Sequence, residues 1–179
     1  MKGMIFTEFI DFVEEQFGLD VVDEMIDASG SDGVYTSVGT YAHDEIVQML
    51  LVLSKRTQIE IPELLKVFGR HLFKYLAGSY PAVIGDTRDG FTLLSQIDNH
   101  IHVEVRKLYP DSELPKFTYE MASDDQMTLV YRSERALADL AEGLLFGCFE
   151  HFGQNVDINR EDLSDGQCRH VKFDIRKIA

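Results

Sequence analysis

Residues 127–135 read MTLVYRSER, and this stretch decides the fold class. Apolar side chains recur at every second position from Met127 to Tyr131, which is the period of a β-strand with one buried face. Ser133 then stands where a helix cap is expected, and the apolar spacing that follows predicts a helix over residues 134–151. The change of period therefore predicts a strand that runs directly into a helix.

The segments on either side divide the chain into a helical part and a mixed part. Alternation returns at residues 156–158 and 171–175, and the polar loop between them suggests a hairpin. Earlier in the chain, a short helix is expected after Asp20, and longer helices are predicted over residues 6–17, 41–55, 62–78 and 91–108. This order indicates an α+β fold, with a mainly helical N-terminal part and a small antiparallel sheet and helix in the C-terminal half.

Composition narrows the class of protein. The 179 residues, 45% of them hydrophobic, suffice for one domain over residues 1–179. A net charge of −14, from 17 basic and 31 acidic residues, argues against nucleic acid or an anionic membrane as a partner. The two cysteines form no CxxC and exclude a disulfide scaffold. The longest apolar run, residues 49–53, is too short for a membrane span, and no signal-peptide core is present, so a cytoplasmic protein is expected.

The common catalytic motifs are missing from this sequence. It contains no GxSxG, HExxH, P-loop or GxGxxG, and no pair of carboxylates stands out for acid–base work. We therefore expect a protein that is not an enzyme.

His102 is the most informative of the six histidines. On a wheel of residues 91–108 at about 100° per residue, His102 lies roughly 80° from the centre of the apolar stripe, and His100 lies roughly 120° away. His102 is thus better placed to reach an interior pocket. A single interior imidazole without clustered cysteines is a poor zinc site, but it suffices as an axial ligand of heme iron.

Tyr131, Ser133 and Arg135 form a second group at the junction of the strand and the helix. Two hydroxyls and a forked cation suit one or two carboxylates, bound by charge-assisted hydrogen bonds. The structural alternative is a helix cap with a surface ion pair between Arg135 and Glu134.

These residues resemble the signature of a known family. The pattern YxSxR at residues 131–135 is similar to that of heme-nitric oxide/oxygen binding (H-NOX) domains, which are relatives of the sensor domain of soluble guanylate cyclase. Three further stretches agree in the family's order: MKGMIF at the start, IHVEVRKLYP with His102 seven residues before Tyr109, and AEGLLFG at residues 141–147. The resemblance covers the whole chain and is closest to the stand-alone bacterial type.

The resemblance implies a fold that encloses heme b (iron protoporphyrin IX), with a distal helical subdomain over about residues 1–60 and a proximal one over about 61–179. His102 would be the proximal ligand of the iron, and the YxSxR residues Tyr131, Ser133 and Arg135 would hold the two propionates. Ile5 and Pro115 match the positions that press on the porphyrin and bend it. Ordinary helix packing for Ile5 and a simple turn for Pro115 remain compatible with these roles.

The resemblance also implies which gas is preferred. Oxygen-binding members are expected to carry a tyrosine hydroxyl at the position of Leu140, supported at the positions of Phe9 and Leu72; here all three are apolar. Bound O₂ needs a hydrogen-bond donor, whereas NO and CO depend on one much less. An NO sensor that also binds CO is therefore expected.

The mode of signalling is implied in the same way. NO weakens the bond opposite to it, so the helix that carries His102 can be released and the heme can relax against Ile5 and Pro115. The chain carries no kinase or cyclase motif, so its output is expected to pass to a separate protein. The resemblance suggests a histidine kinase or a cyclic-di-GMP synthase or phosphodiesterase.

Two alternative functions and one further metal site remain open. A heme peroxidase or NO-consuming enzyme could use the same pocket, although the apolar residues count against it. A heme-free small-molecule-binding interaction module would leave His102 with a structural role. Some relatives hold zinc near the C-terminus, and Cys168 and His170 share a strand face, with Cys148 and His151 as further candidate ligands.

Overall fold

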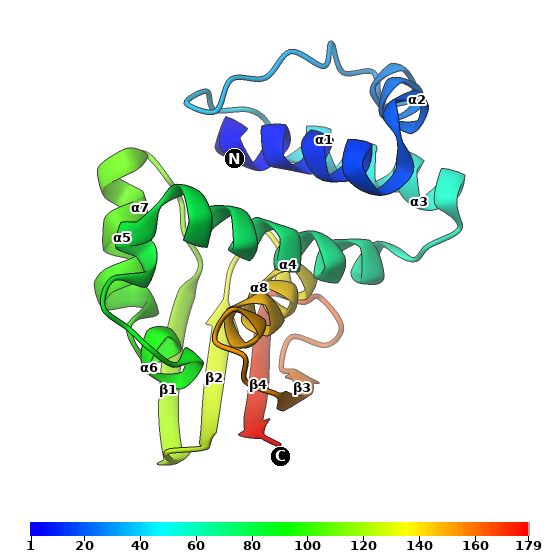
Figure 1. Cartoon of the computed structure of the whole chain (residues 1–179). Helices are drawn as coiled ribbons and strands as arrows, with labels where there is room; N and C mark the ends of the chain where they lie inside the picture. Colours follow the sequence, from blue (N-terminus) through cyan, green and yellow to red (C-terminus); the bar gives the residue numbers. More distant parts are fainter. Residues whose placement is uncertain (179) are drawn as a thin grey trace. The chain divides into compact units, whose positions relative to one another are not determined.

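The computed structural model describes residues 1–178, which fall into two compact units (Figure 1). The first comprises residues 1–68 and the second begins at Gly69. Helix α4 (Ile61–Ser79) contributes to both units. No helix among the described residues is both long and apolar enough to cross a membrane.

The first unit is helical and has an aromatic core. It contains α1 (Gly3–Phe17), α2 (Leu19–Ser29) and α3 (His43–Thr57), so the expected helices are present with shifted ends. The rings of Phe9 and Phe68 meet edge to face at 5.1 Å, and Phe12 packs on the same ring of Phe68 at 5.6 Å. Gly18, with φ of +90°, makes the sharp break between α1 and α2 that a side chain would disfavour.

The second unit is a sheet with helices. Its helices are α5 (Pro81–Ile84), α6 (Gly90–Ser95), the π-helix η1 (Ile97–Ile101), α7 (His102–Leu108) and α8 (Ala138–His151). Its strands are β1 (Lys116–Ser123), β2 (Gln126–Arg132), β3 (Val156–Asp162) and β4 (His170–Lys177). All neighbouring strands are antiparallel, in the order β1-β2-β4-β3. The expected α+β class and the β3–β4 hairpin are confirmed.

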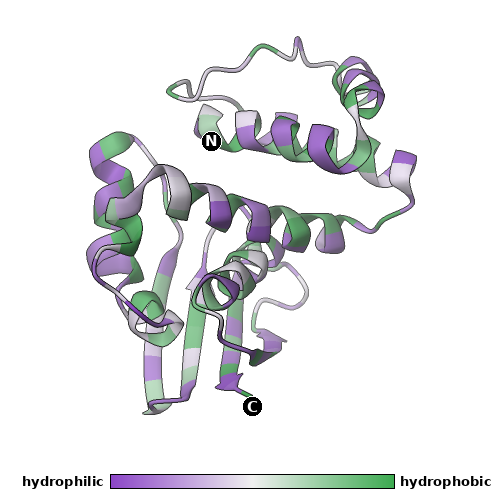
Figure 2. Cartoon of the chain, in the orientation of Figure 1, coloured by the Kyte–Doolittle hydropathy of each residue, from purple (hydrophilic) through white to green (hydrophobic). Residues whose placement is uncertain are grey.

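Alternation along the two central strands places the core on one face of the sheet. Leu129 of β2 pairs with Phe173 of β4, and both are fully buried. Figure 2 shows the resulting hydrophilic and hydrophobic bands along β4. Helix α8 covers the apolar face and contributes Leu145 and Phe149 to the same core (Figure 1).

Glycines allow α4 and α8 to approach each other closely within the second unit. A Cβ at Gly69 would lie 2.5 Å from the carbonyl oxygen of Leu140 and 2.8 Å from the backbone of Gly143. A Cβ at Gly147 would lie 2.8 Å from the Cβ of Phe73. Side chains at these positions would push the two helices apart, because closely packed backbone has no room to yield.

The single helix predicted over residues 91–108 is wrong, because π-helical turns interrupt it. The backbone N–H of His102 bonds the carbonyl of Ile97, five residues back, which widens the helix at this point. The wheel at 100° per residue therefore loses its phase. His102 becomes buried, whereas Leu108, which the wheel places in the apolar stripe, is exposed.

The helix predicted to begin at residue 134 begins instead at Ala138, so Ser133 does not cap it. Ala136 adopts a left-handed conformation, with φ of +54°, and this interrupts any regular helix before it. The Ser133 hydroxyl accepts a hydrogen bond from the backbone N–H of Arg135, two residues on, at 3.2 Å. Residues 133–137 thus form a turn between β2 and α8.

Strand β1 was not predicted, although its sequence carries a signal. Phe117, Tyr119 and Met121 alternate with more polar residues, as a strand requires. The strand lies at the edge of the sheet, where Tyr119 and Met121 remain exposed. This leaves little contrast in burial between its two faces.

The close crossing at Gly69 leads to a stability prediction. Gly69→Ala should lower the free energy of unfolding by about 1–3 kcal/mol, because the added methyl group collides with the α8 backbone. Gly78→Ala, in the same helix but with nothing within 4 Å of the added Cβ, should be neutral or stabilise by up to about 1 kcal/mol. Urea unfolding of both variants measures the difference. Equal effects would show that Gly69 is not a close-packing position.

Candidate functional site

His102 is buried at the start of α7, with its imidazole held by a carboxylate. The residue is 7% exposed, and its Nδ1 lies 2.8 Å from Oδ1 of Asp98, one turn earlier. Burial lowers the pKa of His102, although the negative charge of Asp98 opposes that shift. The resulting neutral ring donates Nδ1–H to Asp98, and its Nε2 lone pair is available for a metal.

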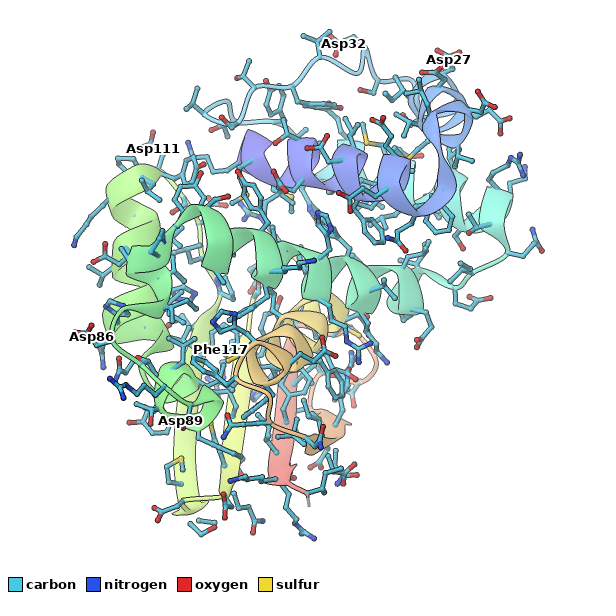
Figure 3. The ribbon with its side chains drawn as sticks, in the orientation of Figure 1. Asp27, Asp32, Asp86, Asp89, Asp111 and Phe117 are labelled. Carbon is cyan, nitrogen blue, oxygen red and sulfur yellow. The ribbon has the colours of Figure 1, made fainter. Side chains whose placement is uncertain are left out.

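An aromatic chain connects His102 with the YxSxR residues inside the second unit. The ring of Phe117 lies 5.9 Å from that of His102 and 5.6 Å from that of Tyr131, between centroids. Phe117, labelled in Figure 3, is partly buried against the core of this unit, and Pro115 lies half-buried two residues before it. The structure thus brings the imidazole and the signature tyrosine into contact with the same phenyl ring.

Tyr131 fixes the turn that follows β2. Its hydroxyl accepts a hydrogen bond from the backbone N–H of Leu137 at 3.1 Å. Burial raises the pKa of Tyr131, so the phenol stays protonated at neutral pH and can act as a donor.

Arg135 lies in the same turn but does not pair with Glu134. Its Nη1 donates to the carbonyl oxygen of Glu113 at 2.9 Å, and its Nη2 contacts the carboxylate of the same residue. Glu134 instead lies 3.5 Å from a nitrogen of Arg169. The surface pair considered as the alternative role for Arg135 is therefore wrong.

Three of the four predicted apolar residues are buried, and the fourth is half-buried. In the second unit, Leu72 lies on α4 and Leu140 on α8, next to the crossing at Gly69. In the first unit, Phe9 is fully buried in the aromatic core, and Ile5 is half-buried on α1. None of these four side chains carries a hydrogen-bond donor.

Three neighbours of the site were missed in the sequence. Asp98 could have been found, because a carboxylate four residues before a helical histidine lies on the same face. Phe117 belongs to the strand that was not predicted. Glu113 gave no signal, because it lies 22 residues from Arg135 in an irregular segment.

Two of the candidate zinc ligands, Cys168 and His170, contact arginine side chains. Cys168 Sγ lies 3.1 Å from Nη2 of Arg160, and His170 Nε2 accepts a hydrogen bond from Arg132. Cys148 is buried in the core. Within residues 1–178, no three His, Cys, Asp or Glu side chains come together in a way that could hold a metal. A cation beside Cys168 would also disfavour a second one there.

Arg160 connects β3 with α8. Its Nη1 contacts the carboxylate of Asp139 and lies 3.1 Å from that of Glu142, in largely buried surroundings. These interactions raise the pKa of Arg160 against the opposing effect of burial. The guanidinium therefore neutralises two buried carboxylates in the helix that carries Leu140.

The comparisons with known proteins agree with one another. A family model described as Haem-NO-binding matches residues 2–160. An H-NOX protein from K. algicida, in the Fe(II) unliganded state, is 43% identical, with a TM-score of 0.93 over 100% of this chain and 97% of that one. An H-NOX protein from S. oneidensis in the Fe(II)NO state is 32% identical, with a TM-score of 0.92 over 100% of both chains.

A solution structure extends this set. The IWP-051-bound H-NOX from Shewanella woodyi, in the Fe(II)CO state, is 40% identical, with a TM-score of 0.84 over 99% of this chain and 95% of that one. No curated protein matches the chain.

The ion cluster around Arg160 leads to a second stability prediction. Arg160→Leu should lower the free energy of unfolding by about 3 kcal/mol, because it removes the cation that contacts two largely buried carboxylates, Asp139 and Glu142. Arg56→Leu breaks a pair with Glu24 that is half exposed, and should cost less than about 1 kcal/mol. Chemical unfolding of both variants is the measurement. A loss at residue 160 no larger than that at residue 56 would contradict the prediction.

Proposed function

The chain belongs to the Haem-NO-binding (H-NOX) family, and from this premise we propose that it is a heme-based nitric oxide sensor that signals through a separate partner protein. H-NOX proteins are heme-based gas-sensor domains and not enzymes. Structures of relatives carry NO or CO on Fe(II), so the family binds these gases. The preference of this chain for NO, its partner and its cytoplasmic location belong to the proposal.

The donor set of the second unit fits heme b. His102 offers a neutral Nε2 whose ring is oriented by Asp98, as an axial ligand requires. Tyr131 and Arg135 offer a hydroxyl and a guanidinium for carboxylates. The buried hydroxyl of Ser112, in the segment next to Glu113, has no hydrogen-bond partner among the described residues and could accommodate a further polar group. The buried imidazole held by Asp98 is the observation that carries the proposal.

The roles assigned to the individual residues remain part of the proposal. His102 is the iron ligand, and Tyr131, Ser133 and Arg135 hold the propionates. Ile5 and Pro115 set the shape of the porphyrin. Phe9, Leu72 and Leu140 line the gas side.

The apolar side chains support NO over O₂. When bound, the heme would supply an iron for a diatomic gas, and His102 would hold that iron. Phe9, Leu72 and Leu140 provide no donor for a polarised O₂, and a charge-assisted hydrogen bond is worth about 1.5–3 kcal/mol. This absence of donors also disfavours the peroxidase alternative, which needs a polar group to cleave an O–O bond.

The helix that carries His102 is suited to act as the moving element. Helix α7 spans only His102–Leu108 and follows π-helical turns, which hold the backbone less well than regular α-helix. A weaker bond between the iron and His102 would therefore shift the equilibrium between two positions of α7. A histidine kinase or a cyclic-di-GMP synthase or phosphodiesterase would read that change.

The iron ligand can be tested by cavity rescue. His102→Gly should abolish the absorption spectrum of tightly bound heme, and added imidazole should restore it, because only the ligating ring has been removed. His100→Gly, two residues away, is the matched control and should retain the spectrum. An unchanged spectrum in His102→Gly would contradict the assignment. A wild-type protein that takes up no heme would favour the heme-free interaction module.

Gas selectivity can be tested at Leu140. Leu140→Tyr should raise the affinity for O₂ by about 10-fold or more, because its hydroxyl can donate to the bound gas. Leu163→Tyr, at an exposed position, adds the same group elsewhere and should have no effect. Oxygen titration of the reduced proteins provides the measurement. An unchanged oxygen-binding curve for Leu140→Tyr would count against a place for this residue beside the gas.

A further inference from the structure

The guanidinium of Arg135 is already engaged by an acidic residue. Two groups of Glu113 hold it: the carbonyl oxygen at 2.9 Å from Nη1, and the carboxylate next to Nη2. The side chain of Arg135 is 25% exposed, whereas that of Glu113 is 84% exposed. A carboxylate that water surrounds this freely loses little when it leaves its partner.

Glu113 lies on the segment that follows the helix of His102. Residues 109–115 connect the end of α7, which begins with His102, to the start of β1, and Pro115 is the last of them. Figure 3 labels Asp111 in this segment. The contact between Glu113 and Arg135 therefore ties this connection to the turn after β2.

A propionate and the Glu113 carboxylate are the same chemical group and compete for the same cation. A guanidinium has five N–H donors and one positive charge, and Glu113 neutralises that charge. A propionate at Arg135 also meets the negative charge of Glu113 directly, in a protein whose net charge is −14. Both effects weaken the hold on a propionate.

We propose that Glu113 is a built-in competitor for Arg135 that sets how tightly the chain holds the propionates of its porphyrin. This inference rests on the heme site proposed above. It assigns Glu113 the role of tuning Arg135 by charge, with no contact to the iron or the gas.

Two contacts keep Arg135 in place independently of the Glu113 carboxylate, so the charge of that carboxylate can be removed without moving Arg135. The carbonyl oxygen of Glu113 still holds Nη1 when the side chain changes, and the Ser133 hydroxyl still holds the backbone N–H of Arg135. Glu113→Gln keeps the size and an acceptor oxygen while removing the charge. This substitution therefore alters the competition without releasing Arg135.

Transfer of heme to an excess of apomyoglobin tests the proposal. Glu113→Gln should lose heme about 2–5-fold more slowly than the wild type, because the removed pair is an exposed one, and the difference should shrink in about 1 M salt. Asp111→Asn removes an exposed carboxylate two residues before Glu113 and should leave the rate unchanged. In an Arg135→Gln background, Glu113→Gln should have no effect.

The dimethyl ester of the iron porphyrin is the second probe. It lacks ionised propionates, so Glu113→Gln should bind and release it at the wild-type rate. Urea unfolding of the porphyrin-free proteins should show a slightly lower midpoint for Glu113→Gln and an unchanged cooperative transition, which confirms that the variant folds.

Several outcomes would overturn the proposal. These are heme loss from Glu113→Gln that is unchanged or faster, an equal effect of Asp111→Asn, or a difference that persists with the diester. Faster loss would mean that the carboxylate positions Arg135 for the porphyrin. A wild-type chain that takes up no heme would overturn the proposed function as well, whereas normal uptake without an effect at residue 113 would overturn this inference alone.

Discussion

The hydrogen bond between Asp98 and His102 is the interaction on which the rest of the site depends. A buried imidazole without a partner would be costly, and a freely rotating one would present either nitrogen. Asp98 satisfies Nδ1 and fixes the ring at 2.8 Å. The π-helical turns before His102 turn it into the interior, next to Phe117. Residues 97–102 therefore determine both the position of the His102 ring and which of its nitrogens is held by a hydrogen bond.

Much of the fold could be predicted because its signals are periodic. The alternation at residues 127–131 and the helical spacing before it were sufficient for the α+β class, and the YxSxR pattern pointed to the family that the comparisons establish. The π-helical turns could not be predicted, because a wheel presumes a fixed angle per residue. Ser133 matched the composition of a cap, yet the left-handed Ala136 delays the helix to Ala138. Local preference does not reveal which of two adjacent turns the tertiary structure selects.

The partners of the cations were beyond the reach of the sequence for a different reason. Arg135 pairs with Glu113 and Arg160 with Asp139, each across about 20 residues or more. Many carboxylates compete for each cation in a chain with 31 acidic and 17 basic residues. Neighbours in sequence such as Glu134 are then no better candidates than distant ones. Only the register of the sheet and the path of residues 109–115 decide the pairing.

Two partly buried arginines have different roles in this acidic chain, because their carboxylate partners differ in exposure. Arg160 neutralises Asp139 and Glu142 in surroundings that largely exclude water, so separating these charges is costly and the cluster stabilises the contact of β3 with α8. Arg135 faces a carboxylate that is mostly in water, so its partner can be exchanged at little cost. An arginine–carboxylate pair is therefore structural where both members are largely buried, and its carboxylate can be replaced where that carboxylate is exposed. An anionic ligand can compete successfully only at the second kind of pair.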